Sequence, residues 1–456
     1  MLDINLFRTD KGGDPEIVRE SQRRRFADVT LVDQVIEIDN EWRKVRYQLD
    51  QFQKELNAIS KEVGQIKKAG GNADELQEKS KETKKQMTET EELEQSIIKK
   101  RDSILANMGN IVHDSVPISQ DEANNAIVKE YGERRQEEKL YNHVDLVALL
   151  GIVDLEAGQT VAGGRGYYLI GEGVLLNQAL INYGLQFAYT RNYKPVHTPF
   201  FMRKEIMSEC AQLSQFDEEL YKVTGEGDDK YLIATSEQTL CALHRQGWFE
   251  KGDLPVKYVG YSTCFRKEVG SHGRDTLGIF RIHQFEKIEQ FCITTPEGSA
   301  SWEAMEEMLG NAEGFYQGLD LPYRVVNIVS GELNNAAAKK YDLEAWFPAS
   351  KTYRELVSCS NCTDYQARRL DIRLRVPKGQ GGEQGGNRFV HMLNSTLTAT
   401  ERTLCCVLEN YQTPDGLRIP KVLQPFMMGM EFIPFRKMFD AKGKLVDRAP
   451  AAKAAE

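Results

Sequence analysis

The sequence has no long hydrophobic segment. None of its apolar runs approaches the roughly 20 residues that are needed to span a bilayer. The first residues, Met1–Asn5, lack the basic and apolar regions of a signal peptide, and the acidic residues that follow disfavour an organelle transit peptide. We therefore expect a soluble, cytoplasmic protein without a membrane partner.

The sequence also lacks a large excess of charge of either sign. It contains 59 Lys and Arg and 68 Asp and Glu, a formal net charge of −9 at pH 7. This excludes a generally basic protein that coats nucleic acid, but not an enzyme that meets nucleic acid through local basic patches. Hydrophobic residues make up 41% of the 456 residues, so the chain can build a sizeable core, and its length suits two or three domains.

No complete metal-binding or phosphate-binding motif is present. Of the eight cysteines, only Cys359 and Cys362 form a Cys-x-x-Cys pair, and no second pair or His-x-x-His follows at zinc-finger spacing. Structural zinc normally needs a full set of such ligands, so we predict no zinc site and free thiols in a reducing cytosol. The glycines between Gly379 and Gly386 are not followed by Lys-Ser or Lys-Thr, so they form no P-loop.

What the sequence does contain is a long coiled-coil repeat near its start. From Leu31 to Ile66 the apolar residues are spaced alternately four and three residues apart without a break. They are Leu31, Val35, Ile38, Trp42, Val45, Leu49, Phe52, Leu56, Ile59, Val63 and Ile66. At a rise of about 1.5 Å per residue, this repeat predicts a helix about 55 Å long with one apolar seam.

A second helix is predicted to fold back on the first. Gly70-Gly71-Asn72 breaks the first helix, and Ala73–Met108 follows with a sparser apolar stripe. The stripe consists of Leu76, Met87, Leu93, Ile97, Ile104 and Met108. A short break between two amphipathic helices favours an antiparallel hairpin over the alternative, an intermolecular coiled coil. Residues 1–115 contain 20 Lys and Arg and 23 Asp and Glu, a net charge of −3, so the hairpin is no basic rod.

The composition changes after the hairpin. Pro117 and the acidic stretch Gln120–Glu122 indicate a linker, and from about Tyr131 short β-rich runs alternate with helices. The clearest are two β-rich runs, Tyr167–Ile170 and Val256–Tyr261, and one helix, Trp302–Tyr316. We therefore predict an α+β protein with an N-terminal helical arm over residues 1–115, a mixed body over 116–440 and a flexible C-terminal tail over 441–456.

One predicted strand carries an unusual set of side chains. A β-rich run from Ile279 to Ile293 follows the polar loop after Phe265–Glu268. Since alternate residues of a strand share a face, one face would carry Arg281, His283, Phe285, Lys287 and Glu289. Cations, an aromatic ring and a carboxylate together are unusual in a core. From the pattern alone, this face is either a solvated outer surface or a binding site.

Three segments together resemble the motifs of class II aminoacyl-tRNA synthetases. Phe-Arg-x-Glu at 265–268, followed by Arg-x-His-Gln-Phe-Glu-Lys at 281–287, resembles motif 2. Pro199 resembles the motif 1 proline, and residues 394–404, with Arg402, resemble motif 3. Thr235-Ser236-Glu237 is similar to the serine-recognition loop of the seryl-tRNA synthetase family, and the hairpin resembles that family's N-terminal arm. The resemblance covers nearly the whole chain and points to the eukaryotic cytosolic type.

This resemblance implies a fold and a reaction. The fold would be a class II catalytic domain built on an antiparallel sheet flanked by helices, in a homodimer with motif 1 at its interface. The reaction would be that of a serine–tRNA ligase, in which L-serine and ATP form seryl-adenylate and the seryl group passes to the 3′ end of tRNA(Ser). Whether tRNA(Sec) is a further acceptor stays an open question at this point. The expected partners are ATP as a substrate, Mg²⁺ as a cofactor, and tRNA(Ser) bound by the arm.

The resemblance also implies roles for single residues. Arg266 and Arg402 would be catalytic, since placed cations stabilise charge that builds on phosphate oxygens. The implied ATP contacts are Arg266, Glu268, Arg281, Ile282, His283, Gln284, Phe285, Glu355, Leu356, Val357, Ser358 and Arg402. Glu355 and Ser358 would also hold Mg²⁺, which prefers hard oxygen ligands. Serine would be bound by Thr235, Glu237, Arg266, Glu289 and Asn394.

Two alternative functions stay open at this point. Another class II synthetase, such as a threonyl or prolyl enzyme, is disfavoured because those enzymes lack this kind of arm. A catalytically altered, synthetase-like protein that binds tRNA or regulates is expected to have lost a motif arginine or the Mg²⁺ carboxylate. Arg266, Arg402 and Glu355 are all present in this sequence.

Overall fold

The computed structural model describes residues 1–211, 219–225, 227–268, 277–376 and 388–448. The chain divides into two compact units, Met1–Ile111 and Val112–Glu456. No helix within the described ranges is both long enough and apolar enough to cross a membrane. The glycine-rich segment 379–386 and the last part of the predicted tail, 449–456, lie outside the described residues.

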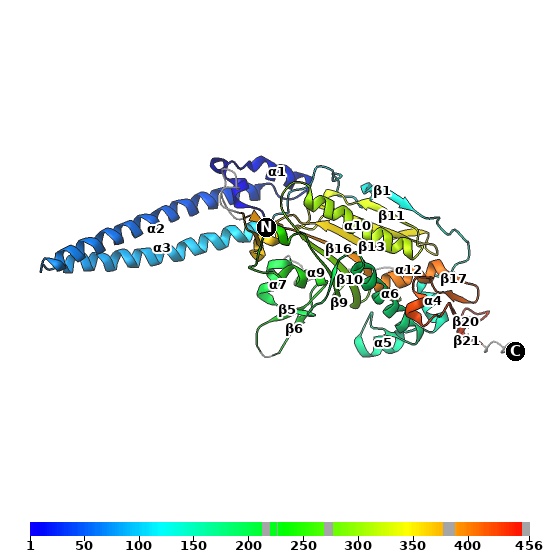
Figure 1. Ribbon diagram of the computed structural model, residues 1–456. Coiled ribbons are helices and arrows are strands. Elements are labelled where there is room, and N and C mark those ends of the chain that lie inside the picture. The colour runs from blue at the N-terminus through cyan, green and yellow to red at the C-terminus, as the bar shows by residue number, and fades with distance from the viewer. Residues whose placement is uncertain (212–218, 226, 269–276, 377–387, 449–456) are drawn as a thin grey trace. The chain divides into compact units, whose positions relative to one another are not determined.

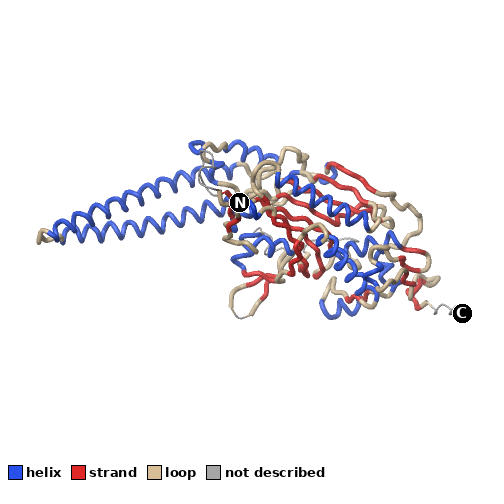
Figure 2. The backbone as a smooth tube through the Cα atoms, viewed as in Figure 1, coloured by secondary structure: helices blue, strands red, loops and turns tan. Residues whose placement is uncertain are grey.

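The first unit is dominated by two long helices. α2 (Thr30–Lys68) and α3 (Asp74–Asn107) run antiparallel and side by side (Figures 1 and 2), which confirms the predicted hairpin. Shorter elements precede them: η1 (Ile4–Phe7), η2 (Thr9–Lys11) and α1 (Pro15–Arg24). Asp14 starts α1, because its side chain accepts a hydrogen bond from the Glu16 N–H and Pro15 occupies the first helical position.

The two long helices contribute unequally to the seam between them. On α2, every predicted seam residue is buried or half-buried. On α3, the predicted stripe is wrong at Leu93, which is 48% exposed, and the buried residues include Thr83 and Glu94. These polar side chains have partners, as buried polar groups require. The Trp42 Nε1–H donates to Glu94 Oε1 at 3.2 Å, and the Thr83 hydroxyl donates to Lys79 O at 2.9 Å.

Asp39 is the centre of an ionic cluster in this unit. Its buried carboxylate accepts hydrogen bonds from Nε and Nη2 of Arg8, both at 2.7 Å, and from Arg101 Nη1 at 3.2 Å. The Arg43 Nε lies 3.3 Å from the same carboxylate. Arg8 and Arg101 also lie over the Trp42 ring, 5.3 and 5.8 Å from its centroid. Burial alone would raise the pKa of Asp39, but the three arginines hold its pKa below its usual value.

The second unit is built on an eight-stranded sheet. Its strands are, in spatial order, β1 (Ala126–Tyr131), β11 (Tyr323–Asn327), β12 (Lys339–Phe347), β13 (Thr352–Asn361), β16 (His391–Ala399), β10 (Gln284–Thr294), β9 (Val256–Phe265) and β4 (Lys194–His197). All neighbours are antiparallel except β4 and β9, which are parallel. The predicted α+β class and antiparallel sheet are therefore confirmed.

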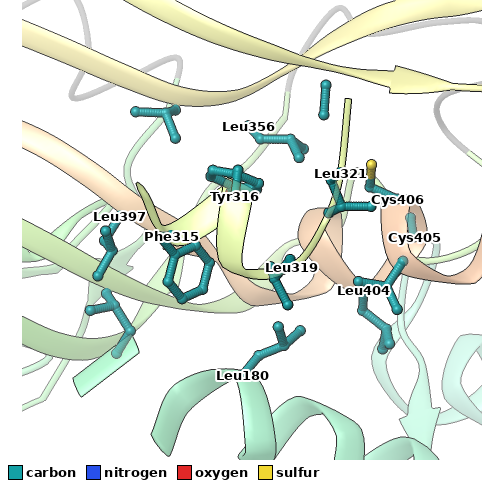
Figure 3. Close-up of a cluster of buried hydrophobic side chains, with 14 of the residues drawn as sticks. Leu180, Phe315, Tyr316, Leu319, Leu321, Leu356, Leu397, Leu404, Cys405 and Cys406 are labelled. Carbon is teal, nitrogen blue, oxygen red and sulfur yellow. The ribbon is translucent and has the colours of Figure 1, made fainter. Parts of the chain in front are cut away.

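Helices cover both faces of this sheet. α6 (Glu172–Tyr189), α10 (Ala300–Gly318) and α12 (Thr400–Tyr411) pack on one face. Figure 3 shows part of the apolar core there, where Leu180, Phe315 and Leu404 come from these three helices. On the other face, α9 (Ser236–Ala242) and α11 (Tyr365–Leu370) pack against Phe291 of β10. The further helices are α4 (His143–Leu150), α5 (Leu155–Ala162), α7 (Lys204–Cys210), η3 (Glu122–Asn124), η4 (Lys251–Asp253), η6 (Ser330–Glu332) and η7 (Gln424–Met427).

Small sheets complete the second unit. They are β5 (Phe201–Arg203) with β7 (Lys230–Leu232) and β6 (Lys222–Val223), β15 (Arg388–Phe389) with β14 (Arg373–Leu374) and β8 (Trp248–Phe249), β17 (Gln412–Thr413) with β18 (Gly416–Arg418) and β19 (Phe432–Pro434), β2 (Val153–Asp154) with β3 (Tyr168–Leu169), and β20 (Lys437–Phe439) with β21 (Leu445–Asp447). β21 falls within the predicted flexible tail. The Arg448 N–H donates to Arg436 O at 2.8 Å, so the chain has a defined structure up to this residue, which the sequence did not indicate.

The Asp39 cluster leads to a test of stability. Asp39→Asn should destabilise the first unit by about 2–4 kcal/mol at pH 7, because it leaves three guanidiniums without their carboxylate. Since the folded-state pKa of Asp39 is lowered, its contribution is present above the unfolded-state pKa and is lost as the pH falls through the folded-state pKa. The difference between Asp39→Asn and the wild type should therefore shrink in strongly acidic solution. Urea unfolding of the full-length chain, followed by circular dichroism, measures it.

Asp50→Asn is the matched control for this test. Asp50 belongs to the same helix, and its side chain is 54% exposed and lies 3.4 Å from Arg46 Nη2. An exposed ion pair contributes little, so the control should change the unfolding curve far less than Asp39→Asn does. Equal losses in the two variants would contradict a special role for the buried cluster.

Candidate active site

β10 positions the centre of the site. The predicted strand begins at Ile279. In the structure, the ladder with β9 begins at the pair Gln284–Phe265, so β10 starts five residues later than predicted. Within the strand the predicted alternation holds. The side chains that share the face away from α6 and α10 are those of Phe285, Lys287 and Glu289.

Arg266 is held by its neighbours on this face. Its N–H donates to His283 O at 2.9 Å, and the His283 Nδ1 lies 2.9 Å from Arg266 O. The Arg266 Nε donates to Ala234 O at 3.3 Å, and the guanidinium lies 5.4 Å from the centroid of the Phe285 ring. His283 precedes the strand, so the prediction that it shares the face of Phe285 is wrong: it lines a second cavity, together with Gln284. It supports the backbone of Arg266 instead.

A pocket over this sheet face gathers most of the predicted ATP contacts. It is lined by Arg266, Glu268, Phe280, Arg281, Ile282, Phe285, Lys287, Glu355, Leu356, Thr396, Ala399, Glu401 and Arg402. Four predicted contacts are absent from this lining: His283 and Gln284 line the second cavity, Val357 is fully buried in the core, and Ser358 is half-buried. No role was predicted from the sequence for Phe280, Lys287 or Glu401. An aromatic ring or acidic residue next to a motif arginine was the only signal for Phe280 and Glu401.

The other two arginines of the pocket are paired with carboxylates. Arg281 Nη1 lies 3.3 Å from Glu268 Oε2, and Arg402 Nη1 lies 3.5 Å from Glu355 Oε2. The Arg402 guanidinium also lies 5.1 Å from the centroid of the Phe280 ring. Each arginine is thus oriented before any substrate is bound, which lowers the cost of reorganisation during a reaction.

A β-bulge places the two predicted metal ligands on one face. In the ladder between β12 and β13, Asp342 pairs with Ser358 and Glu344 pairs with Glu355, with a register shift between these pairs. Asp342 and Glu344 are two residues apart and share a face. Because Leu356 is the extra residue of the bulge, Glu355 and Ser358 lie on that same face, although regular alternation would separate them.

The carboxyl groups on this face differ in charge. Burial alone would raise the pKa of Glu355, but Arg402, Lys340 and Arg266 hold its pKa below its usual value. Burial raises the pKa of Asp342 to about 7, against a smaller lowering by Lys340. The Oδ1 of Asp342 is buried and has no hydrogen-bond partner among the residues that the structure describes. This face therefore combines an ionised carboxylate, a hydroxyl and an unpartnered carboxyl oxygen.

Next to the arginines, Lys287 connects two of the predicted serine contacts. Its Nζ lies 2.9 Å from Glu289 Oε2 and donates to Thr235 Oγ1 at 3.2 Å. The Thr396 hydroxyl donates to Glu289 Oε2 at 3.2 Å. Thr235 caps the start of α9, where its Oγ1 accepts a hydrogen bond from the Glu237 N–H at 3.3 Å. Four side chains from three elements thus form one hydrogen-bonded cluster.

The remaining predicted serine contacts lie beside this cluster. The Gln366 Nε2 donates to Glu237 Oε1 at 2.9 Å, and burial, followed by the charge of Glu289, raises the pKa of Glu237. The Asn394 Nδ2 donates to Cys362 Sγ at 3.7 Å. The contacts of Gln366 and Cys362 with these residues were not predicted from the sequence, because each comes from a segment outside the synthetase motifs.

The two thiols of the Cys-x-x-Cys pair make different contacts. Cys362 accepts from Asn394, whereas the buried Cys359 thiol donates to Met305 O at 3.7 Å. Within the described ranges, no three or more His, Cys, Asp or Glu residues are grouped so that they could hold a metal ion. The two sulfurs have different hydrogen-bond partners, Asn394 for Cys362 and Met305 O for Cys359.

Two family models match the chain. The model described as "Seryl-tRNA synthetase N-terminal domain" matches residues 1–112, which contain the hairpin. The model described as "tRNA synthetase class II core domain (G, H, P, S and T)" matches residues 221–411, which contain the pocket and the Lys287 cluster. Both matches agree with the motifs that the sequence analysis identified.

Individual relatives agree over nearly the whole length. The chain is 63% identical over 437 residues to the serine–tRNA ligase of Helianthus annuus, covering 96% of this chain and 99% of that one. It matches the crystal structure of the cytoplasmic serine–tRNA ligase from Naegleria fowleri in complex with AMP with a TM-score of 0.86 and 52% identity, covering 96% and 99% of the two chains. The seryl-tRNA synthetase from Pyrococcus horikoshii complexed with ATP matches with a TM-score of 0.86 and 40% identity, covering 95% and 100%. With such identities over both units, the chain belongs to the seryl-tRNA synthetase family.

Proposed function

We propose that this protein is a serine–tRNA ligase, which joins L-serine to ATP as seryl-adenylate and passes the seryl group to the 3′ end of tRNA(Ser), with tRNA(Sec) open as a further acceptor. The observation that carries the proposal is the position of the Lys287 cluster, with Thr235 and Glu289, directly beside a pocket lined by three arginines. A binding site for a small amino acid therefore adjoins a binding site for a polyphosphate. The relatives from Naegleria fowleri and Pyrococcus horikoshii contain AMP and ATP.

The arginines account for the chemistry of the first step. When the serine carboxylate attacks the α-phosphate, negative charge builds on the phosphate oxygens and on the leaving pyrophosphate. We assign Arg266 to the α-phosphate and the serine carboxylate, and Arg281 and Arg402 to the outer phosphates. The planar guanidinium is always charged and offers paired donors, which suits this task. The Phe285 ring provides an apolar surface for the adenine, and Glu268 accepts from its amino group.

The residues of the bulge fit a magnesium ion. Glu355 and Ser358 supply a carboxylate and a hydroxyl from one face, and hard oxygen donors are the ligands that Mg²⁺ prefers. The unpartnered oxygen of Asp342 lies on that face and adds to the negative potential there. When bound, Mg²⁺ supplies positive charge that neutralises the phosphate oxygens. In the free protein Glu355 orients Arg402, and we propose that it turns to the metal when the nucleotide enters.

Serine recognition follows from the charges of the neighbouring cluster. Glu289 carries a carboxylate that the substrate ammonium can approach beside Lys287, while Thr235, Glu237 and Asn394 provide polar atoms. A site built from buried polar groups rejects alanine, because alanine leaves them without a hydrogen-bond partner. Lys287 is thereby a proposed positioning residue, since it holds Thr235 and Glu289 in one orientation.

We assign tRNA binding to the helical arm, taken as residues 1–115, and catalysis to residues 116–440. Several basic residues of the arm are already paired, such as Arg43 with Asp10 at 2.9 Å and Lys79 with Glu55 at 2.8 Å. The exposed lysines of the arm without an ion-pair partner among the described residues are Lys11, Lys44, Lys54, Lys61, Lys67, Lys68, Lys84, Lys85, Lys99 and Lys100. Because residues 1–115 have a net charge of −3, the arm would recognise RNA by its shape and by selected phosphate contacts rather than by bulk attraction.

The proposal extends to location and assembly. A cytoplasmic location is supported by the relative from Naegleria fowleri, whose name includes that location. A homodimer is supported by the resemblance of Pro199 to the motif 1 proline. The alternative of a catalytically altered relative has no support, since Arg266, Arg402 and Glu355 all line the pocket.

Serine-dependent exchange of pyrophosphate into ATP tests the activity directly. Arg266→Ala should slow this exchange by at least about 10²-fold, because it removes a placed cation from the transition state. Arg418→Ala, which changes an exposed arginine of β18, should leave the rate near that of the wild type. Near-normal exchange in Arg266→Ala would refute its assignment, and exchange with another amino acid but not with serine would refute the proposed substrate.

The magnesium assignment makes a separate prediction. Glu355→Gln should raise the Mg²⁺ concentration that gives half-maximal exchange by at least about tenfold, because a neutral amide is a weaker ligand than a carboxylate. Glu332→Gln, an exposed glutamate of η6, is the control. If the variant loses rate at an unchanged Mg²⁺ dependence, Glu355 serves Arg402 alone.

The arm can be shortened without disturbing the Asp39 cluster. A variant in which residues 53–82 are replaced by a short glycine-containing turn should keep serine-dependent exchange and lose charging of tRNA(Ser) by about 10²-fold, since it removes four of the exposed lysines together, Lys54, Lys61, Lys67 and Lys68. Measuring both reactions on one preparation provides the internal control. Equal losses in the two reactions would mean that the removed segment supports the catalytic body.

A further inference from the structure

Behind the nucleotide pocket, two glutamates meet side chain to side chain. Glu286 of β10 points to the face opposite Phe285, and its carboxyl group makes a hydrogen bond with that of Glu401, the second residue of α12. Asn177 Nδ2 of α6 donates to Glu286 Oε2 at 3.0 Å. The Tyr167 hydroxyl lies 3.1 Å from Glu401 Oε1.

Glu401 also replaces a missing bond of the sheet. The ladder between β10 and β16 ends at the pair Lys287–Ala399, where the chain of β16 turns into α12. The next N–H of β10, that of Glu286, therefore has no strand carbonyl opposite it. It donates instead to the Glu401 carboxyl group, at 3.1 Å to Oε2 and 3.3 Å to Oε1. The Thr400 hydroxyl adds a bond to Oε2 at 3.1 Å.

Cations lie near this pair: Arg165 lines a cavity together with Glu286, and Arg402 and Lys287 line the pocket together with Glu401. Neither Glu286 nor Glu401 forms an ion pair with a Lys or Arg in the part of the chain that the structure describes. The uncharged groups that face the pair are Tyr167 beside β3, Asn177 of α6, Tyr261 of β9, and Thr400 and Cys405 of α12. All of these are neutral near pH 7. Glu401 is 1% exposed.

A second ionised carboxylate beside Glu401 is costly, because Glu401 is almost fully buried. Like charges in contact repel, and the cost is large where water is excluded. Burial and then the hydrogen-bonded Glu286 raise the pKa of Glu401 well above its usual value. The backbone N–H donors favour the ionised form of Glu401, whereas Glu286 favours the protonated one. A single proton held between the two carboxyl groups is compatible with both the N–H donors and the neighbouring carboxyl group.

We infer that Glu286 and Glu401 share one proton in the folded protein, and that this bridge positions the two sides of the nucleotide pocket. Glu286 directly follows Phe285, and Glu401 directly precedes Arg402. A bond between the two carboxyl groups thus couples the ring proposed for the adenine to the arginine proposed for the phosphates. Both are positioning residues. The role in ATP binding rests on the proposed function, whereas the shared proton does not.

The inference is tested with Glu401→Gln and Glu401→Ala in the full-length chain. Glutamine is always neutral, and its amide can donate to Glu286 as the shared proton does. Because the folded-state pKa of Glu401 is raised, its contribution to stability is present below its unfolded-state pKa and is lost as the pH rises through its folded-state pKa. Over a pH series that begins near the unfolded-state pKa of Glu401, the wild type should therefore lose stability relative to Glu401→Gln as the pH rises, by up to about tenfold in the folding equilibrium per pH unit.

Thermal and urea unfolding at several pH values give this difference without any substrate. The control is Glu431→Gln, an exposed glutamate, whose difference from the wild type should not change with pH. A Glu401→Gln difference that stays constant across this series would overturn the shared proton. A Glu401→Gln variant that becomes less stable than the wild type as the pH rises would overturn it as well.

ATP binding gives the second readout. In serine-dependent exchange, Glu401→Ala should raise the KM for ATP about tenfold with little change in the KM for serine, and Glu401→Gln should restore most of the loss. Equal KM values for ATP in the two variants would overturn the positioning role. If the wild type shows no serine-dependent exchange, the proposed function fails, while the unfolding series still decides whether the proton is shared.

Discussion

The constraint on which the catalytic unit depends is that a strand presents successive side chains on opposite faces. In β10 this separates Phe285, Lys287 and Glu289, which line the site, from Ile288 and Cys292, which lie in the core. A shift of one residue in register would bury Lys287 among apolar side chains and expose the core residues. Pairing with β9 and β16 on both sides prevents such a shift, so the position of the site and the stability of the core have one cause.

The charges of the site are paired with one another in the absence of substrate. Arg281 lies beside Glu268, Arg402 beside Glu355 and Lys287 beside Glu289. Each pair keeps a partly buried cation from being left unpaired and also orients it. In the proposed reaction, the phosphates of ATP would bind the arginines in place of their carboxylate partners. The serine ammonium would bind Glu289 beside Lys287. In this way the protein holds the charges that the reaction needs without a large penalty to its own folding.

Sequence periodicity predicted the elements that depend on local patterns. The seam of α2 was correct because each of its residues is apolar. On α3, Leu93 was wrong because Glu94 takes the seam position, where it is held by Trp42 of the other helix. The motifs likewise placed Arg266 and Arg402 in the pocket, but the roles of His283 and Lys287 depend on where a strand begins and on a distant threonine. Such contacts arise from the tertiary structure and produce no recognisable pattern of residue spacing in the sequence.

Two buried acidic side chains, Asp39 and Glu401, are stabilised in opposite ways. Asp39 is surrounded by three arginines and stays ionised, so its contribution to stability is lost in acid. Glu401 has another carboxyl group as its neighbour and keeps a proton, so its contribution is lost in base. The first arrangement suits a rigid helical element that no substrate has to enter. The second suits a position behind an ATP pocket, because an added cation there would compete with Arg402 for the phosphates, whereas a neutral hydrogen bond joins the two sides of the pocket without changing its charge.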